Sequence, residues 1–386
     1  MLPVIIFTLH KLDRSGDVLR PLQLLAHLKR EHESLRVIVH LTSTEPGLLD
    51  DAFQRAGVVI IRGRKGAMGP VDFWKSCRAH RATLAHINAG MNSGFYLLAA
   101  FLAGIGSRFC HFRTEREHRH SVRDRLVGRL GVWLSVVFAT RIVGVSAVAR
   151  HFPRIPARKW RTIFNGFASE EPEVALPKRG GGEARVKTIL VLGRIDGGKN
   201  CLRAVSIFEE HVARHGRRGL RLRFVGTGRA EDVARLEARI AASPVARAIA
   251  LHGLSDAPLA HLREAALLLF PSRWEGLPGA VLEALSVGTA VVASDIPATR
   301  EIAAAVEGVR LVPLAAPDAL WSDRIAEALR LHDARTIISS FRSGPFLFED
   351  HVANMSELWS LPAAALGAPA ARIGQAEPRC ALPLPS

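Results

Sequence analysis

Short apolar runs separated by amphipathic segments recur along most of the chain. In the first half we expect strands at residues 3–9, 36–41, 58–61, 84–87, 108–112, 141–145 and 161–164. Helical patterns separate most of these runs, at residues 18–28, 48–56, 93–103 and 115–138. Continuous apolar runs are typical of strands buried on both faces of a parallel sheet. Their alternation with helices predicts a doubly wound α/β sheet.

The alternation stops at residues 171–186 and then begins again. This stretch contains Pro, three consecutive Gly and mixed charges, a composition typical of a linker. Beyond it we expect strands at 188–192, 222–225, 248–251, 267–270 and 289–293, and helices at 202–215, 232–242, 257–265 and 350–359. The sequence therefore predicts two similar α/β halves with a cleft between them. Residues 361–386 lack a periodic apolar face and are expected to form a disordered tail.

Composition and charge narrow the functional class. The 386 residues are 48% hydrophobic and 23% charged, which indicates a globular chain large enough for two cores. The net charge of +16 favours an anionic partner, or reflects a genome that favours Arg and Ala. A single Tyr and the lack of a recognition motif argue against nucleic acid. Four scattered cysteines predict neither a zinc site nor disulfides, and no apolar stretch reaches the length of a membrane span, so we expect a cytoplasmic protein.

The stretch from residue 267 to residue 294, LLLFPSRWEGLPGAVLEALSVGTAVVAS, concentrates the candidate chemistry. It reads as a strand, a loop carrying Glu275, a short helix with Glu283 near its first turn, and another strand. Ligands of open α/β sheets bind at the carboxyl ends of the strands, where this loop lies. Glu283 can accept hydrogen bonds from the two hydroxyls of a ribose, and Glu275 from those of a second sugar.

Cations and glycines follow neighbouring strands at the same expected edge. Arg194 and Lys199, in the loop GRIDGGKN, could neutralise a diphosphate, and the helix that starts near Gly279 offers free backbone N–H groups to the same anion. Glycine lets the backbone approach a ligand closely. The remaining candidate contacts to the nucleotide or sugar are Gly226, Gly253, Leu254, Gly276, Leu277 and Pro278.

Most of these signals also have a structural explanation. A Gly-Thr-Gly loop ends many α/β strands, Arg194 and Lys199 could form a solvated basic face, and Glu283 could simply favour the helix dipole. The complete string PSRWEGLPGAVLEAL is much more specific.

These motifs resemble the retaining glycosyltransferases of the GT-B fold, in particular family 4. Glu275 and Glu283 match the family's Glu–seven residues–Glu motif, and Gly193, Arg194 and Lys199 match its G-R-x-x-x-x-K motif. Further matches are Asn165-Gly166 at the domain junction, Ser146 after the last strand of the first half, and Glu301. The resemblance covers roughly residues 1–360 and is strong in the second half and looser in the first.

Within this family the first half is most similar to bacterial exopolysaccharide, capsule and lipopolysaccharide transferases. The similarity lies in HINAGMNSGFYLLAAFLAGIGSRFCHFR, where His111 stands at the position of the family's second histidine. One departure concerns the first loop, in which Ser15-Gly16 replaces a Gly-Gly pair that meets the donor phosphate and the acceptor. Gly16 still allows close approach to the diphosphate, whereas Ser15 adds a Cβ.

The resemblance implies transfer of a sugar from a nucleotide sugar, usually UDP-linked, to a lipid-linked or saccharide acceptor with retained configuration. Arg194, Lys199 and Gly16 would hold the diphosphate, Glu283 the ribose, and Glu275 the hydroxyls of the donor sugar. His111 would lie near the reacting carbon, although a lone histidine at a strand end could equally be structural. Reaction on one face, with the leaving phosphate taking the acceptor proton, is expected ahead of a covalent route through Glu275.

No metal or other cofactor is expected. The chain has no Asp-x-Asp motif, and its cations and a helix N-terminus can neutralise the diphosphate in place of a metal ion. His111, His118 and His120 in HFRTEREHRH could be suspected as ligands, but a solvated basic helix face is favoured over a metal site.

The resemblance also implies a domain organisation. We expect an N-terminal Rossmann-like acceptor-binding domain at 1–170, a linker at 171–186, a C-terminal Rossmann-like nucleotide-sugar-binding domain at 187–345, a return helix at 346–360 that crosses back to the first domain, and the tail at 361–386. Clustered arginines are expected to share a helix face that docks on the anionic inner membrane: Arg113, Arg116, Arg119, Arg123, Arg125 and Arg129. A catalytically silent relative that binds a partner or membrane, and a nucleotide-sugar 2-epimerase, stay open as alternatives.

Overall fold

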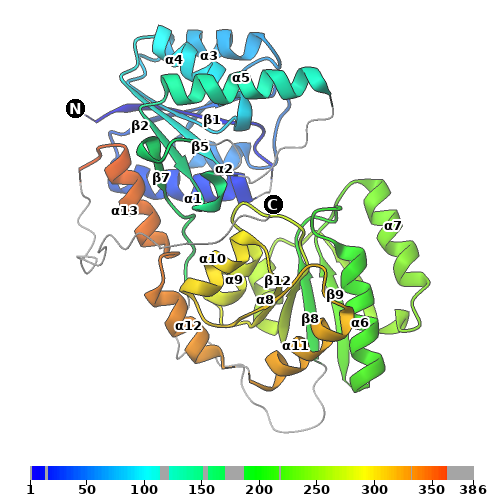
Figure 1. The fold of residues 1–386 in the computed structure, drawn as a ribbon. Coiled ribbons are helices and arrows are strands. Elements are labelled where there is room, and N and C mark those ends of the chain that lie inside the picture. Colours follow the sequence, from blue (N-terminus) through cyan, green and yellow to red (C-terminus); the bar gives the residue numbers. More distant parts are fainter. Residues whose placement is uncertain are drawn as a thin grey trace.

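The computed structural model describes residues 2–13, 16–113, 121–150, 155–169, 187–216, 219–331 and 333–362. Two parallel sheets, each flanked by helices, form two domains that lie one above the other (Figure 1). We call the domain built on the first sheet the N-domain and the domain built on the second sheet the C-domain.

The N-domain sheet has the order β3-β2-β1-β4-β5-β6-β7, and every strand pair in it is parallel. Its strands are β1 (Val4–Leu9), β2 (Arg36–Leu41), β3 (Val59–Arg62), β4 (Leu84–Ile87), β5 (Ser107–Phe112), β6 (Arg141–Gly144) and β7 (Trp160–Thr162). Helices α1 (Gly16–Glu31), α2 (Asp50–Arg55) and α13 (Phe348–Leu358) cover one face. Helices α3 (Met68–Ala79), α4 (Ser93–Leu102) and α5 (Val122–Phe138) cover the other.

The C-domain sheet repeats the doubly wound pattern with the order β10-β9-β8-β11-β12-β13. Its strands are β8 (Lys187–Leu192), β9 (Leu220–Val225), β10 (Ile249–Gly253), β11 (Leu267–Phe270), β12 (Val291–Ser294) and β13 (Val309–Val312). Its helices are α6 (Cys201–His215), α7 (Ala230–Ala241), α8 (Pro258–Glu264), α9 (Gly279–Ser286), α10 (Pro297–Ala305), α11 (Asp318–Arg330) and α12 (Ala334–Ser343). In both sheets the strand order reverses beside the first strand, which places a ligand crevice at the carboxyl ends of the central strands.

The two doubly wound domains and the returning helix confirm the expected fold. Val352, Met355 and Trp359, in or just after α13, pack into the core of the N-domain although they follow the whole C-domain in sequence. The sequence reading missed α3 and all elements from α10 to α12. The expected helix at 115–138 begins at Val122, after the N-cap Ser121, whose side chain accepts from Asp124 N. Residues 115–120, the expected linker at 171–186 and the tail from 363 onward lie outside the described residues.

The chain passes between the domains twice, and the two passages lie against each other. Phe167 N donates to Phe346 O at 2.9 Å, and Phe348 N donates to Phe167 O at 3.1 Å. A Cβ on Gly166 would lie 2.6 Å from Phe348 Cα and 2.6 Å from His351 Cβ, so only glycine fits there. We call residues 165–167 together with 346–348 the hinge. Its pairing explains in steric terms why glycine stands at position 166.

Helices α4 and α5 approach each other through glycine. A Cβ on Gly94 would lie 2.0 Å from Gly131 O, and a Cβ on Gly131 would lie 2.0 Å from Met91 O. Backbone atoms at this distance must move apart, since no side-chain rotation relieves the overlap. The close approach packs α5 against α4 and leaves the opposite face of α5 outward.

We therefore expect Gly94→Ala to lower the free energy of unfolding by about 1–3 kcal/mol, the usual cost of overpacking a packed interior. Urea denaturation followed by circular dichroism measures it. Gly106→Ala is the matched control, because a Cβ on Gly106 meets no atom within 4 Å. Equal stability of the two variants would show that α4 and α5 do not pack this closely.

Candidate active site

The two domains meet in an ion pair between α1 and α9. Arg20 Nη2 donates to Glu283 Oε1, while Arg20 Nη1 donates to Gln23 Oε1 at 2.8 Å. The guanidinium carbon lies 3.9 Å from the centre of the Phe167 ring, so the hinge itself forms one wall of the contact. Sequence reasoning gave Arg20 no role, and no local signal marks it, because its partner is 263 positions away.

A second pair lies next to the first within the C-domain. Lys199 Nζ donates to Glu275 Oε1 at 2.6 Å and lies 4.8 Å from the centre of the Phe270 ring. Lys199 also acts on Glu283, since its charge is among the causes that lower the pKa of that carboxyl. The structure thus brings together Arg20, Lys199, Glu275 and Glu283, which we call the charge cluster.

Burial dominates the electrostatics of Glu283. It raises the pKa of this carboxyl, and the nearby charges of Arg20 and Lys199 oppose that rise. The side chain lies in the second turn of α9, which begins at Gly279, so the sequence reading of a first-turn position was wrong. A carboxylate there gains little from the helix dipole, because that effect is confined to the first turn.

The start of α9 is open to a ligand. Pro278 is the N-cap residue and makes no side-chain hydrogen bond to the helix. The first N–H groups of a helix need external partners, and a phosphate is a suitable one. Gly276 and Pro278 are buried beside this end, and Leu277 is partly buried.

Arg194 does not join the charge cluster. Its side chain is 82% exposed, and its Nε lies 3.6 Å from Asp196 Oδ2. Asp196 also accepts from Lys199 N at 2.9 Å, which fixes the loop after β8. Arg194 therefore lies at the rim, with room to swing toward an anion.

The glycines of the expected site differ in what surrounds them. Gly226 has φ +142°, and a Cβ there would lie 1.9 Å from Gly193 O, so the loop after β9 packs directly on the loop after β8. Gly253, with φ +82°, ends β10, has open space around it and precedes the exposed Leu254. Gly16 begins α1 and also faces open space. Its neighbour Ser15 lies outside the described residues.

His111 lies near the end of β5 and belongs to a buried chain of rings. Trp359 Nε1 donates to His86 Nδ1 at 3.1 Å, and His86 Nε2 lies 3.1 Å from His111 Nδ1. Because the indole N–H can only donate, the network assigns the proton of His86 to Nε2 and the proton of His111 to its own Nε2. Burial holds the pKa of both histidines well below the usual range, so both are neutral.

The Nε2 atom of His111 is buried and has no hydrogen-bond partner among the described residues. A neutral imidazole with its proton there is a donor, not a base. Sequence reasoning found His111 but not His86 or Trp359, which set its protonation.

A second contact joins the domains beside the loop after β6. Ala147 N donates to Glu301 Oε1 at 3.0 Å, and Ser146 Oγ accepts from Ala149 N at 3.2 Å. Burial raises the pKa of Glu301, and hydrogen bonds from the backbone N–H groups of Ala147 and Val148 oppose that rise. Glu301 thus bonds to the residue that follows Ser146, and both residues, which sequence reasoning singled out separately, lie at this contact between the domains.

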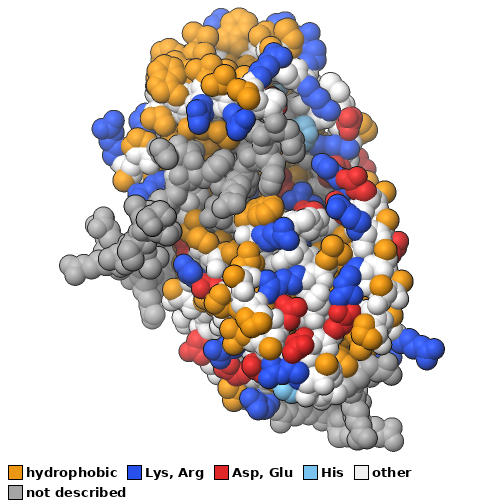
Figure 2. Space-filling view, turned by 45° about the vertical axis from the view of Figure 1, so that its right-hand side comes forward, with side chains coloured by type: hydrophobic (Ala, Val, Ile, Leu, Met, Phe, Trp, Pro, Cys, Tyr) orange, Lys and Arg blue, Asp and Glu red, His pale blue; other side chains and the backbone are white. Residues whose placement is uncertain are grey.

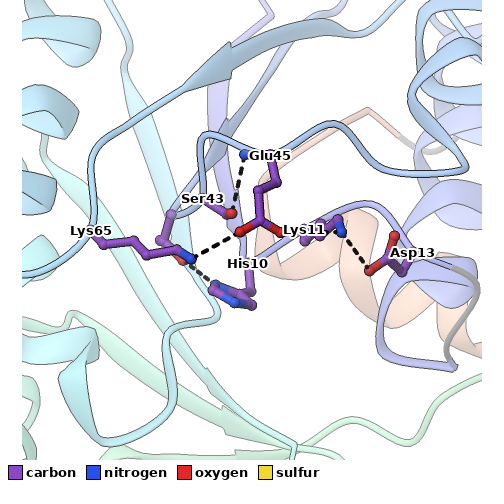
Figure 3. Close-up of polar contacts among 7 residues, drawn as sticks. His10, Lys11, Asp13, Ser43, Glu45 and Lys65 are labelled. Atoms are coloured by element: carbon purple, nitrogen blue, oxygen red, sulfur yellow. Dashed lines mark hydrogen bonds and ion pairs between the residues drawn. The ribbon is translucent and has the colours of Figure 1, made fainter.

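Polar side chains gather beyond the carboxyl ends of β1, β2 and β3 in the N-domain (Figure 3). Glu45 lies between two lysines, with its oxygens 3.4 Å from Lys11 Nζ and 3.4 Å from Lys65 Nζ. His10 Nδ1 lies 2.9 Å from Thr42 Oγ1. Glu45 and Lys65 are exposed and Lys11 is partly exposed, so these groups can exchange their mutual contacts for contacts to a ligand.

One arginine of the expected basic helix face, Arg113, does not lie on that face. Arg113 directly follows strand β5 and is only partly exposed; it donates to Asn88 Oδ1 at 2.9 Å and to Asn165 Oδ1 at 3.3 Å, and burial lowers its pKa to about 10. Arg123, Arg125 and Arg129 are exposed on α5. Arg116, Arg119, His118 and His120 lie outside the described residues. The described part of the chain holds no group of three or more His, Cys, Asp or Glu side chains arranged to bind a metal ion.

Two facing doubly wound domains, with the candidate residues at the strand ends, define a protein of the GT-B class. The family model described as glycosyl transferases group 1 matches residues 186–330, which span most of the C-domain. The sequence is 26% identical over 298 residues to the capsular polysaccharide biosynthesis glycosyltransferase CapH of Staphylococcus aureus, covering 76% of this chain and 81% of CapH.

Solved structures share the fold across both domains. Anabaena HepE, solved with UDP-glucose, superposes with a TM-score of 0.75 at 16% identity, covering 93% of this chain and 99% of HepE. The lipopolysaccharide outer core galactosyltransferase WaaB gives 0.68 at 15% identity, covering 92% of this chain and 98% of WaaB. The chain is a glycosyltransferase of the GT-B fold with a group 1 domain.

The Lys199–Glu275 pair can be tested in the empty protein. We expect Lys199→Met to lower the free energy of unfolding by about 1–2 kcal/mol, because it leaves a largely buried carboxylate without its cation. Adding Glu275→Gln removes the stranded charge, so the double variant should lose less than the sum of the single losses.

Urea denaturation measures the free energy of unfolding of Lys199→Met, of Glu275→Gln and of the double variant. Arg229→Met is the control, because its pair with Glu231 is exposed, at 83% and 69%, and should contribute under about 1 kcal/mol. Strictly additive losses would show that Lys199 and Glu275 do not interact.

Proposed function

We propose that this protein transfers a sugar from a UDP-linked donor to a lipid-linked or saccharide acceptor in cell-surface polysaccharide synthesis, with retention of configuration. The observation that carries the proposal is the charge cluster beside the uncapped start of α9, where cations and carboxylates meet within one cleft. The names of the relatives support the pathway and the nucleotide: CapH is a capsular polysaccharide transferase, and HepE was solved with UDP and with UDP-glucose.

In this proposal each part of the donor contacts a different group of the site. The first N–H groups of α9, Lys199 and the rim residue Arg194 neutralise the diphosphate as its bond to the sugar breaks. Glu283 accepts hydrogen bonds from the ribose, and Glu275 from the hydroxyls of the sugar. Gly226, Gly253 and Leu254 lie at the ends of neighbouring strands, beside the nucleotide.

A reaction on one face of the sugar suits this arrangement. A carboxylate that is paired with a lysine is a poor nucleophile, and Glu275 is held by Lys199 at 2.6 Å. The acceptor hydroxyl then attacks from the side that the diphosphate leaves, and a phosphate oxygen takes its proton. Lys199 and the helix end supply the positive charge that a metal ion provides elsewhere, so we propose that the reaction needs no metal.

His111 has a role as a hydrogen-bond donor in this scheme. Its Nε2–H is buried and has no partner among the described residues, and an unpaired buried donor is costly unless a ligand engages it. A hydroxyl of the donor sugar, near the reacting carbon, meets that requirement. The accessible groups around Glu45 in Figure 3 lie on the N-domain side, where we propose the acceptor binds.

A screen of nucleotide sugars tests the donor. UDP-sugars should raise the melting temperature more than GDP- or ADP-sugars, because a ligand that binds only the folded state stabilises it. Glu275→Ala should lower turnover of the accepted donor by about 100-fold or more, as for other groups that contact the transition state. Bound UDP with no turnover of any UDP-sugar, in transfer or in hydrolysis, would contradict the proposal.

We further propose that α5 docks on an anionic membrane that carries the acceptor. Its outward face is apolar along its whole length, with side chains between 46% and 63% exposed at Val122, Leu126, Leu130, Trp133 and Val137. These positions recur three or four residues apart and form one stripe. Arg123, Arg125 and Arg129 are exposed on the same helix, and Phe101 and Leu102 at the end of α4 are exposed as well.

Figure 2 shows hydrophobic side chains, with Lys and Arg beside them, gathered at the end of the molecule where α3, α4 and α5 lie in Figure 1. An apolar stripe bordered by arginines fits the boundary between lipid headgroups and acyl chains. Among the described residues no helix combines the length and apolar character that a bilayer span needs. The proposed contact is therefore a peripheral one through α5.

Sedimentation with vesicles tests this contact. The protein should bind vesicles rich in phosphatidylglycerol and bind phosphatidylcholine vesicles weakly. The double variant Leu130→Ser/Trp133→Ser should weaken binding by about tenfold or more, because each side chain loses its burial in the membrane. Leu331→Ser, at a leucine 64% exposed in the C-domain, is the control and should leave binding unchanged. Failure to bind anionic vesicles even at low salt would rule the contact out.

A further inference from the structure

Arg20 is held at the domain boundary from three sides. Gln23 accepts from one nitrogen of the guanidinium at 2.8 Å, Glu283 accepts from the other, and the Phe167 ring covers its face. The arginine side chain is 13% exposed and that of Glu283 is 22% exposed. A planar guanidinium held by a hydrogen bond, an ion pair and a stacked ring has little freedom left to lose, so its position is largely set before a ligand arrives.

The ion pair makes the state of the Glu283 carboxylate depend on both domains. Glu283 belongs to α9 in the C-domain, whereas Arg20 belongs to α1 in the N-domain. Burying a carboxylate away from water is costly unless a cation accompanies it. Any rotation at the hinge that opens the cleft moves Arg20 away from Glu283. The carboxylate is therefore buried and paired in the closed arrangement alone.

The other cation near Glu283 already has a partner. Lys199 donates to Glu275, and in the proposed function it also faces the diphosphate. A donor adds two negative charges to a cluster that already holds two carboxylates. The stabilisation that Lys199 gives to the charge of Glu283 must therefore fall when the donor binds. His351 lies near Arg20, but burial lowers its pKa to about 4, so it is neutral. Arg20 is then the main counter-charge of Glu283.

We propose that Arg20 is a positioning residue of the donor site, which keeps the Glu283 carboxylate charged and turned toward the ribose hydroxyls when the domains close. The inference rests on the proposed function, in which Glu283 receives the ribose. Arg20 engages Oε1, and no hydrogen bond to Oε2 occurs within the described residues, which leaves that oxygen for the nucleotide. Recognition of the ribose and closure of the cleft are thereby one event.

The test compares two ligands that share the diphosphate and differ only at the ribose. UDP and 2′,3′-dideoxy-UDP are titrated into the full chain by calorimetry between about pH 5.5 and about pH 8. The ratio of their affinities isolates the ribose contact, because titration of the phosphate cancels. Wild type should prefer UDP by about tenfold or more, and the preference should stay constant across this range.

Arg20→Ala should lose the preference in a pH-dependent way. Without its cation the buried carboxyl of Glu283 has a still higher pKa, so it takes up a proton as the pH falls and accepts hydrogen bonds poorly. The preference should drop below about twofold at the acidic end and return in part at the alkaline end. Arg20→Lys should keep most of it, since it keeps the charge.

Two further variants separate this role from a general loss of structure. Arg194→Ala should weaken both ligands alike and leave their ratio unchanged. Gln23→Ala, at an exposed position, removes one contact of Arg20 and should lower the ratio in the same direction by a smaller factor, which keeps the test decisive if Arg20→Ala unfolds. Thermal unfolding without ligand identifies such a failure.

The outcomes distinguish the two proposals. If wild type binds both ligands equally, the assignment of the ribose to Glu283 is wrong, and the proposed donor site falls with it. If wild type prefers UDP and the Arg20 and Gln23 variants keep that preference at every pH, the donor site stands and the role of Arg20 is overturned.

Discussion

The cleft of this protein depends on the hinge, where the two passages between the domains pair with each other. Phe167 is its central residue: its backbone bonds to Phe346 and Phe348, and its ring covers Arg20. The same ring lies 3.7 Å from where a Cβ on Gly279 would stand, so it also borders the start of α9. The Phe167 ring thus lies between Arg20 of the N-domain and the start of α9 in the C-domain. A change in the angle of the hinge would alter both contacts together.

The carboxyl ends of both sheets supply the charges that this geometry brings together. In water, a lysine and a glutamate gain little from each other, whereas in a partly buried cleft an unpaired charge is costly. The empty site balances its two carboxylates with Arg20 and Lys199. In the proposed function a diphosphate adds negative charge to this cluster, and Arg194 at the rim is exposed and able to approach it. The two carboxylates of the empty site are therefore already paired with cations, and Arg194 can supply a further positive charge when a ligand is bound.

Sequence reasoning brought candidate residues together where they are close in sequence or follow neighbouring parallel strands. Glu275, Glu283 and the start of α9 fall within one short stretch, and parallel strands bring Lys199 to the same edge. It failed where a contact joins distant segments or where burial decides. Arg20 lies 263 positions from its partner. Arg113 looks like any surface arginine in the sequence, yet the structure partly buries it against two asparagines.

The missed elements have a similar explanation. Helix α3 buries only Gly69, Phe73, Ser76 and Cys77, so a single large apolar residue marks its inner face. A stripe this weak does not stand out from the surrounding loops, because periodicity needs several apolar positions to be visible. Helices α11 and α12 pack against α6 and α9, which lie far earlier in the chain, so no local pattern announces them.

The return helix contributes to the chemistry as well as to the connection. Trp359 comes from the end of the chain, inserts into the N-domain core and donates to His86, and this single hydrogen bond determines which nitrogen of His111 carries the proton. Without the indole, His86 could reverse its tautomer and His111 would present a lone pair, not a donor, at the strand end. The tautomers of His86 and His111 are thus fixed only when Trp359 is packed in the N-domain core. The crossing that closes the fold also sets the hydrogen bonding of the site.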